Sequence, residues 1–413
     1  MVEVSSHNKI VVLDPGLEGR SGHHYALYEA AQKRVGSDLG NVEIKFYARK
    51  NSAGEFDFFE DIFVAEHFDS KLYQFYQSRP TVGEAHRYTS QLAEEYYRAM
   101  LCEVVVNESI GERRVTFLYP AVKWEHLAAI GIAISELESF DKKNIEIKHK
   151  ICLMYNPGID FDGNLFSVEE FLGYRIAAKY LSIREDVFFY VSDYELSVQY
   201  KDVFQRKLKI HPCYLFDFSS ISRRSMSFSS GGERKIGLYH GDAKREKGFL
   251  ELPRALESIL PQLSTEDRIY IQYTLNNSDL SLNNTADKIK HIAENDQRVV
   301  LVDEFLSGES LMCQISELSE YIFLYDSAHY ENKSSGIAWL VGYFKCPSTT
   351  IGSSWISREL KRLGVPLRVA PSVASISLTE NLHQSFIKKE DYELRSIMYD
   401  DFWFGVGILA ERN

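Results

Sequence analysis

Two runs of alternating strand and helix signals, separated by a serine-rich segment, constrain the fold of this 413-residue chain more than any other feature. Short apolar stretches in both runs are typical of buried parallel strands, and the segments between them carry apolar residues at helical spacing. The separating segment, residues 219–232, contains seven serines and two glycines and almost nothing to bury. The pattern predicts an α/β protein of two doubly wound, Rossmann-like domains that face each other across a ligand-binding cleft.

The serine-rich segment also sets the expected domain boundaries. We expect a first domain at 1–218, a linker at 219–233 and a second domain at 234–391. Residues 56–76 are rich in Phe and Tyr, and we expect them to form an insert that lines the core or a pocket. The expected strands are residues 10–13, 42–47, 115–119, 151–155, 187–191 and 213–216, then 235–239, 269–273, 299–302, 321–325 and 367–370. The expected helices are residues 25–35, 83–100, 127–137, 248–260, 287–295 and 337–344.

Charge and composition exclude several classes of function. The net charge of -12 argues against a nucleic-acid partner, because phosphate backbones need a clustered basic face. Five widely spaced cysteines form no C-x-x-C pair, which favours reduced thiols in a cytoplasmic protein. The polar first residues predict no signal peptide, and no apolar run approaches the roughly 20 residues that span a bilayer. We expect a cytoplasmic protein, and peripheral contact with the inner membrane face stays open.

A small polar turn in the second run joins a buried strand to a helix. The strand covers Tyr321 to Tyr325, and the turn ends at Ser335 and Gly336, where the helix begins. Backbone N–H groups at a helix N-terminus bind anions, so the turn predicts a diphosphate site. Just before the turn lie two further candidates for this site, Tyr330 and Glu331.

A basic loop follows the first strand of the second run. It carries Lys244 and Lys247, and it comes directly after His240 and Gly241. Basic groups at the mouth of a strand neutralise a nucleoside diphosphate. On charge alone, a solvated surface turn explains the same residues equally well.

Two loops of the first run carry histidines at strand ends. The loop at residues 14–25 contains three glycines that let the backbone approach a ligand, and Gly22, His23 and His24 open the following helix. Gly16, Gly19 and Gly22 are three residues apart, which differs from the G-x-G-x-x-G dinucleotide fingerprint. A tight turn with surface histidines stays open as the alternative. Glu125 and His126 follow the strand at 115–119, where a histidine or an acid would act on an acceptor hydroxyl or hold a donor sugar. A helix-starting loop with an exposed His126 explains the same residues equally well.

Metal-dependent chemistry is not expected from the acidic pattern. No Asp-x-Asp stands at a strand end, since Asp160 and Asp162 lie in a loop before Gly163. The hydrolase elbow G-x-S-x-G and the P-loop are also absent from the sequence. We therefore expect neither a metal ion nor a bound cofactor.

These motifs resemble those of the two-domain nucleotide-sugar glycosyltransferases of the GT-B fold, and family 4 in particular. The resemblance is carried by Glu246-Lys247-Gly248-Phe249 and by the order strand, Glu331, small-residue turn and helix before Cys346-Pro347. It implies that Lys247 reaches the donor phosphate and that Glu331 lies near the transferred sugar. The family has a second glutamate where this chain has Trp339, and its arginine positions hold His240 and Gly241, which leaves Lys244 or Arg245 as substitutes.

The resemblance implies a metal-independent glycosyltransferase with a nucleotide diphosphate sugar as donor and a saccharide or lipid-linked acceptor. It further implies retention of configuration, a role in bacterial surface polysaccharide synthesis, and a C-terminal helix at 392–413 that crosses back to the first domain. The functional residues would then be catalytic Glu331, His126 and His24, with the other candidates above binding the donor. Two alternatives stay open. One is a catalytically silent subunit, which Trp339 favours, and the other is a nucleotide-sugar epimerase.

Overall fold

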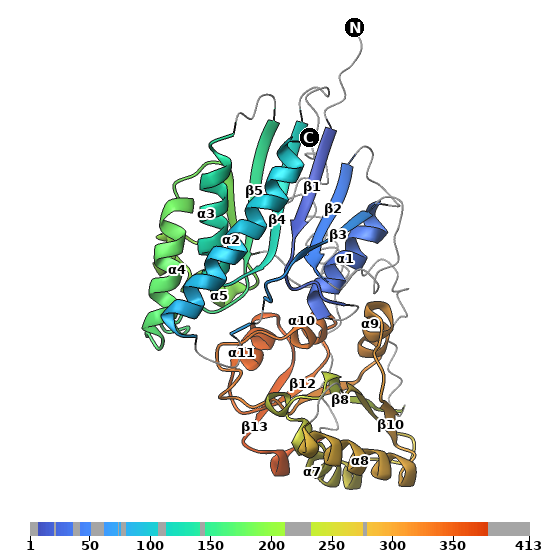
Figure 1. Ribbon diagram of the computed structural model, residues 1–413. Coiled ribbons are helices and arrows are strands. Elements are labelled where there is room, and N and C mark those ends of the chain that lie inside the picture. Colours follow the sequence, from blue (N-terminus) through green and yellow to red (C-terminus); the bar gives the residue numbers. More distant parts are fainter. Residues whose placement is uncertain are drawn as a thin grey trace, which may run out of the picture. The chain divides into compact units, whose positions relative to one another are not determined.

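The computed structural model has two compact units, one formed by residues 1–216 with 397–413 and the other by residues 217–396 (Figure 1). The predicted linker, apart from Glu233, lies outside the described residues, as do the expected strand at 213–216 and the expected helix at 392–413. The domain boundaries therefore stay a prediction. The structure describes residues 7–19, 22–35, 42–50, 62–72, 74–75, 80–105, 113–140, 145–210, 233–275 and 279–378.

The first domain contains a seven-stranded sheet in the order β3-β2-β1-β4-β5-β6-β7. All of its neighbouring strands pair in parallel, so their carboxyl ends meet at one edge. The strand order reverses between β1 and β4, which is the point where doubly wound sheets bind ligands. The strands are β1 (His7–Leu13), β2 (Val42–Arg49), β3 (Ile62–Phe68), β4 (Arg113–Val122), β5 (Ile145–Leu153), β6 (Val187–Val191) and β7 (Lys209–Ile210).

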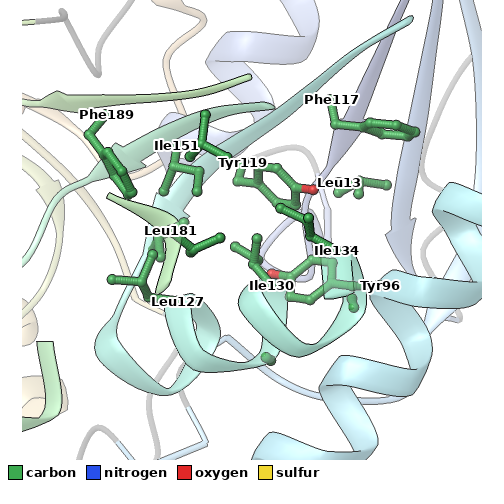
Figure 2. Close-up of a cluster of buried hydrophobic side chains, with 14 of the residues drawn as sticks. Leu13, Tyr96, Phe117, Tyr119, Leu127, Ile130, Ile134, Ile151, Leu181 and Phe189 are labelled. Atoms are coloured by element: carbon green, nitrogen blue, oxygen red, sulfur yellow. The ribbon is translucent and has the colours of Figure 1, made fainter. Parts of the chain in front are cut away.

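Helices cover both faces of this sheet, because successive strand residues point to opposite sides. Val11 and Leu13 join a large core with α2, α3 and α4, whereas Ile10 and Val12 join a smaller core with α1. Figure 2 shows Tyr96, Ile130 and Leu181 of the large core among the side chains that fill it. None of the described helices is long and apolar enough to cross a membrane. The helices are α1 (Gly22–Val35), α2 (Val82–Val105), α3 (Trp124–Leu137), α4 (Val168–Leu181), α5 (Tyr194–Gln199) and α6 (Lys201–Phe204).

The second domain repeats this architecture with six parallel strands in the order β10-β9-β8-β11-β12-β13. Its order reverses between β8 and β11, which therefore mark a second switch point. The strands are β8 (Lys235–Asp242), β9 (Arg268–Thr274), β10 (Val299–Val302), β11 (Glu320–Phe323), β12 (Ser348–Ile351) and β13 (Leu367–Ala370). The helices are α7 (Leu252–Ile259), α8 (Leu280–Asn295), α9 (Gly308–Ser316), α10 (Gly336–Tyr343) and α11 (Trp355–Arg362).

The expected aromatic insert of the first domain is part of the sheet, although Phe68 lines the core as expected. The aromatic stretch at 56–76 contains strand β3, which pairs in parallel with β2 and forms an edge of the sheet. Phe68 is fully buried, and Phe63 is exposed. Aromatic residues are common in strands, and here they mark a sheet edge within the expected insert.

Candidate functional site

The four motifs that the sequence nominates follow the four strands at the two switch points. In the first domain, the glycine-rich loop follows β1, and His126 follows β4. In the second domain, the basic loop follows β8, and the loop that holds Glu331, Ser335 and Gly336 follows β11. Because β1 neighbours β4 and β8 neighbours β11, each domain brings its two loops to the same edge of its sheet.

Close backbone packing joins the two loops of the second domain. Gly248 has a φ of +78°, and a Cβ atom there would lie 2.0 Å from the carbonyl oxygen of Leu324. Next to this contact, the backbone N–H of Asp326 donates to the carbonyl of Glu246 at 3.0 Å. The Lys-Gly sequence thus requires glycine at position 248, since only glycine allows this approach. The contact fixes Lys247 beside the loop that leads to α10.

Lys247 lies in this arrangement as a largely desolvated cation. A Cβ atom on Gly241, which has a φ of +110°, would lie 3.0 Å from the Lys247 Nζ atom. Burial, and then the charge of Lys244, lower the pKa of Lys247 to about 8. Lys247 makes neither an ion pair nor a hydrogen bond through Nζ with any residue that the structure describes. The charges of Asp242 and Glu246 act on the pKa of Lys247 in the opposite direction, but neither carboxylate pairs with Nζ, so the partly compensated cation still favours the binding of an anion.

Two further lysines lie near Lys247. Lys244 is exposed, and its Nζ atom lies 3.3 Å from Asp242 Oδ2 at the end of β8. Lys333, in the loop after β11, contributes to the lowered pKa of Lys247, so its charge lies within electrostatic reach. The sequence interpretation gave Lys333 no role, although its position two residues before Ser335 is a signal for a phosphate contact.

The start of α10 completes this positively charged edge. Ser335 is the N-cap residue with extended backbone, it is buried, and its hydroxyl donates to the Tyr325 hydroxyl at 3.5 Å. The first turn of α10 carries no acidic residue that would compete for its N–H groups. Tyr330 is buried with its ring 4.6 Å from that of Tyr325, and its carbonyl accepts from the Trp355 N–H. Tyr330 therefore shapes the loop from inside.

Glu331 is half-exposed and is bound to α11. Arg358 donates to its carboxylate at 2.6 Å and also contacts its backbone carbonyl. The acid that the resemblance places near the donor sugar is therefore held in one orientation by a guanidinium group.

Trp339 occupies a buried place on α10. Its indole N–H donates to Glu359 Oε1 at 3.2 Å, and its ring packs edge-on against Trp355 at 5.3 Å. Arg362 binds the buried Glu359 carboxylate through two nitrogens. The side chain at the position of the family's second glutamate therefore points into the α10–α11 packing.

His240 and Arg245 face away from the lysine cluster. His240 is buried, and its ring nitrogens contact the Tyr321 hydroxyl at 3.2 Å and Gln314 Oε1 at 3.1 Å. Burial lowers the pKa of His240 to about 4, so the ring is neutral at pH 7. Arg245 binds Asp279 at the start of α8. Of the two substitutes that the sequence offered for the family's arginine, Lys244 is the one near Lys247.

In the first domain, Asp14 fixes the orientation of His24. Asp14 is buried at the end of β1, and its Oδ2 atom lies 2.8 Å from His24 Nδ1. Its other oxygen accepts from the Gly16 N–H at 2.9 Å. A Cβ atom on Gly16 would lie 2.4 Å from the His24 ring, so the glycine lets the loop close over the imidazole.

The neighbours of His24 differ in their environment. His23 stacks on His24 with ring centroids 4.0 Å apart, and burial followed by the charge of His24 holds the pKa of His23 well below its usual value. Gly22 starts α1 with a φ of +76°, and a Cβ atom there would meet none of the described residues within 4 Å. The glycine therefore stands beside the histidine pair in a left-handed backbone conformation that few other residues adopt.

The His126 side chain is buried at the start of α3. Its Nδ1 atom accepts from the Lys123 N–H at 3.3 Å, and its Nε2 atom lies 2.8 Å from the Tyr88 hydroxyl. Burial, and then the charge of Lys123, lower the pKa of His126 to about 3. The ring therefore caps the helix in its neutral form, and the predicted action on a hydroxyl group stays a prediction.

Two carboxyl groups lie near His126, and the sequence interpretation gave no role to one of them, Glu170. Glu125 is buried, its Oε2 atom has no hydrogen-bond partner among the described residues, and burial raises its pKa. Burial, and then the charge of Glu125, raise the pKa of Glu170 in the first turn of α4 to about 7. The sequence Ser167-x-x-Glu170 is a helix-start signature that would have pointed to this pair.

No group of three or more metal-ligating side chains gathers anywhere in the described parts of the chain. Asp160 instead accepts from the backbone and side chain of Asn164 in a surface turn. Metal independence stays a prediction.

No protein-family model and no curated protein sequence matches this chain. Solved structures do match it over nearly its full length. A sucrose-phosphate synthase from Thermosynechococcus elongatus has a TM-score of 0.55 at 11% identity, with 96% of each chain covered. A UDP-forming alpha,alpha-trehalose-phosphate synthase from Burkholderia xenovorans has a TM-score of 0.55 at 10% identity, covering 97% of this chain and 99% of its own.

A third similar structure, trehalose-6-phosphate from E. coli bound with UDP-2-fluoro glucose, has a TM-score of 0.53 at 10% identity, with 97% of this chain and 96% of that chain covered. Identities this low carry information on the fold alone. Both domains are included in the match, and each has the parallel, doubly wound sheet described above. The chain therefore has the two-domain GT-B fold.

Proposed function

We propose that this protein is a metal-independent glycosyltransferase that moves a sugar from a nucleoside diphosphate donor to a saccharide or lipid-linked acceptor. The observation that carries the proposal is the position of Lys247 next to the loop that starts α10. A partly buried ammonium group and the N–H groups of a helix N-terminus together suit a diphosphate. Lys244 and Lys333 add positive charge at the same edge of the sheet.

In this proposal the second domain stabilises the leaving group. When the bond between sugar and diphosphate breaks, negative charge grows on the phosphate oxygens. Lys247 and the start of α10 face that charge from groups already in place, so little reorganisation is needed. The same interactions hold the donor before reaction. They become stronger in the transition state, and this increase is what accelerates transfer.

Glu331 is the group that we propose to contact the transferred sugar. Its carboxylate accepts hydrogen bonds from sugar hydroxyls, and Arg358 keeps it from rotating away. Ribose recognition must come from residues other than Trp339, because that side chain is engaged with Glu359. Retention of configuration is part of the proposal through the family resemblance.

The first domain would present the acceptor. His24, oriented by Asp14, is the group that we propose to bind the attacking hydroxyl, with Gly22 beside it at the start of α1. Similar structures are named as synthases of sugar phosphates, which favours a saccharide over a lipid-linked acceptor. A cytoplasmic role in bacterial surface polysaccharide synthesis, with peripheral membrane contact, completes the proposal.

Thermal unfolding with a panel of nucleoside diphosphates and nucleotide sugars, with and without magnesium, tests this function. A ligand that binds the folded state raises the midpoint by mass action. We expect one nucleotide to raise it without magnesium, and we expect Lys247→Ala and Ser335→Trp to lose that shift. Lys288→Ala, an exposed lysine on α8, is the matched control that should keep it. Equal shifts in all four proteins would refute the assigned site.

A non-catalytic binding role is favoured by one specific observation. Trp339 stands where the family has its second glutamate, and the surrounding α10–α11 contacts are built around the indole. A protein that binds nucleotide but neither transfers the sugar nor slowly hydrolyses the donor would identify this alternative. Release of nucleoside diphosphate from the donor, measured with and without a panel of saccharides, separates the two functions.

A further inference from the structure

The first turns of helices α3 and α4, which pack side by side in Figure 1, bring two carboxyl groups together. Glu125 follows Trp124 at the start of α3, directly after β4. Gly173 of α4 lies against the Trp124 ring, where a Cβ atom would approach to 2.7 Å. Glu170 precedes Gly173 by three residues, so both lie on the side of α4 that meets α3. This packing sets Glu170 beside the start of α3, where Glu125 lies.

The loop after β5 holds Glu170 from another side. Gly158 in this loop has a φ of +82°, and a Cβ atom there would lie 3.2 Å from Glu170 Cβ. The Gly158 carbonyl accepts from the backbone N–H groups of Phe166 and Ser167 at 2.9 and 3.1 Å. The Ser167 hydroxyl in turn accepts from the Glu170 N–H at 3.4 Å and caps α4. The Glu170 backbone is therefore fixed, while its side chain stays only partly buried.

The Oε2 atom of Glu125 is the unsatisfied atom of this pair. Glu125 is 5% exposed, and Oε2 has no hydrogen-bond partner among the described residues. A buried carboxylate oxygen needs a donor, and a buried carboxylic acid needs an acceptor for its own proton, so protonation alone does not satisfy the group. The charge of Glu125 also contributes to the raised pKa of Glu170, so the two carboxyl groups repel each other when both are ionised. A positively charged hydrogen-bond donor would relieve both costs.

Lys123 does not supply this donor. Its Nζ atom lies over the Tyr155 ring, 5.4 Å from the centroid, and it forms no ion pair with any carboxylate that the structure describes. Its charge lowers the pKa of both Glu125 and Glu170, so it acts on the pair from beyond ion-pair distance. The exposed Glu169 acts on both groups in the opposite direction. These four side chains therefore leave an excess of negative charge beside the unsatisfied oxygen.

We propose that Glu125 and Glu170 form a subsite that binds the ammonium group of an amino-sugar acceptor. The inference rests on the proposed glycosyltransferase function, because the loops after β4 and β5 lie at the edge of the first domain where we place the acceptor. An ammonium group carries three N–H donors, enough for Glu125 Oε2 and the Glu170 carboxylate together. Such charge-assisted hydrogen bonds are stronger than those of a neutral hydroxyl. The pair therefore selects an amino sugar over its hydroxyl counterpart.

A metal ion fits the pair less well than an ammonium group. A calcium ion takes about six to eight oxygen ligands. No group of three or more metal-ligating side chains gathers in the parts of the chain that the structure describes. The charge of Lys123 would also repel a divalent cation more strongly than a monovalent one.

Calorimetry on the full chain tests the subsite, with glucosamine and galactosamine as probes and glucose and galactose as their counterparts. The titrations are made with and without the nucleotide that raises the unfolding midpoint. We expect at least one amino sugar to bind about tenfold more tightly than its counterpart. Glu125→Gln and Glu170→Gln should each remove that preference, and an unchanged nucleotide shift shows that both variants fold. Glu136→Gln, at an exposed residue in the last turn of α3, is the matched control and should keep the preference.

Proton release gives a readout that a structural role would not change. At pH 6 the amino sugars are cationic, and Glu170, whose pKa is raised to about 7, is mostly protonated. A bound ammonium group lowers the pKa of a neighbouring carboxyl group, so binding should release up to about one proton per ligand. Titrations in buffers of different ionisation enthalpy measure this release, and Glu170→Gln should reduce it.

Three outcomes would overturn the proposal. Amino sugars that bind no better than their counterparts, while a nucleotide still stabilises the protein, would exclude the subsite and leave the proposed function intact. A preference that both Gln variants keep would place the ammonium group elsewhere. Binding through the pair in a protein that no nucleotide stabilises would exclude the acceptor role, and the proposed function would fail with it.

Discussion

Arg358 holds Glu331 at two points, donating from Nη1 to the carboxylate at 2.6 Å and from Nη2 to the backbone carbonyl at 2.5 Å. The pair links the loop after β11 to helix α11. An acid that contacts a sugar hydroxyl needs a fixed orientation, and this contact supplies it from outside the phosphate site.

Arg358→Met should therefore separate sugar transfer from nucleotide binding. We expect the transfer rate to fall by roughly tenfold to a hundredfold, because an unrestrained Glu331 samples other rotamers. The affinity for the nucleoside diphosphate without its sugar should not change. Steady-state kinetics and calorimetry measure the two quantities, and Arg254→Met on the exposed face of α7 is the control. Equal losses in both quantities would contradict the assignment.

Lys247→Met should stabilise the protein while removing donor binding. Methionine has nearly the same length without the charge, so the cost of desolvating the ammonium, which Asp242 and Glu246 offset only in part, disappears. We expect the free energy of unfolding to rise by roughly 1–2 kcal/mol at pH 7. Denaturant unfolding with and without nucleotide checks both effects. A destabilised variant that still binds nucleotide would show that Lys247 serves the fold.

Donor binding should weaken as the pH rises through about 8. The lowered pKa of Lys247 means that its ammonium form, which binds the diphosphate, is lost above that value in the unliganded protein. Well above pH 8, the dissociation constant should rise by up to about tenfold per pH unit. Calorimetry from pH 6.5 to 9.5 gives the profile, and Lys247→Met should flatten it. A wild-type profile that stays flat to pH 9.5 would exclude this role for the ammonium group.

Gly248→Ala should disrupt the fold locally and with it the donor site. Its Cβ atom would collide with the Leu324 carbonyl at 2.0 Å, in a left-handed backbone conformation. We expect a loss of roughly 2–4 kcal/mol in stability and a weaker affinity for nucleotide. Gly163→Ala is the matched control, since Gly163 also has a positive φ of +87° but none of the described residues within 4 Å of the added atom. Equal losses of stability in the two variants would mean that the surrounding backbone shifts to relieve the collision at position 248.

The sequence predicts the fold class and the positions of all four switch-point loops. Parallel strands buried on both faces are continuous apolar runs, and glycine or polar residues mark their ends, so these signals are local. The contacts of the loop residues were not predictable. His126 and His240 follow strands in the sequence as loop histidines would, yet burial keeps both rings neutral, and their hydrogen bonds go to tyrosines and a glutamine from distant elements.

Among the elements that the sequence did not predict, two were missed for opposite reasons. Helix α4 has apolar residues around its whole circumference, so its sequence lacks the polar face that reveals an amphipathic helix. Strand β12 is polar, with the sequence Ser-Thr-Thr-Ile, yet it lies inside the sheet. Its hydroxyls are satisfied locally, since Thr349 donates to Glu320 at 2.8 Å and Ser348 to the Cys346 carbonyl at 2.9 Å.

The contact between the indole of Trp339 and the carboxylate of Glu359 also limits which residues position 339 can hold. A glutamate at position 339 would face the carboxylate that now accepts the indole N–H, in a place with little water to separate two like charges. The two positions are therefore coupled, and the double-glutamate arrangement of the family that the motifs resemble would require a change at position 359 as well.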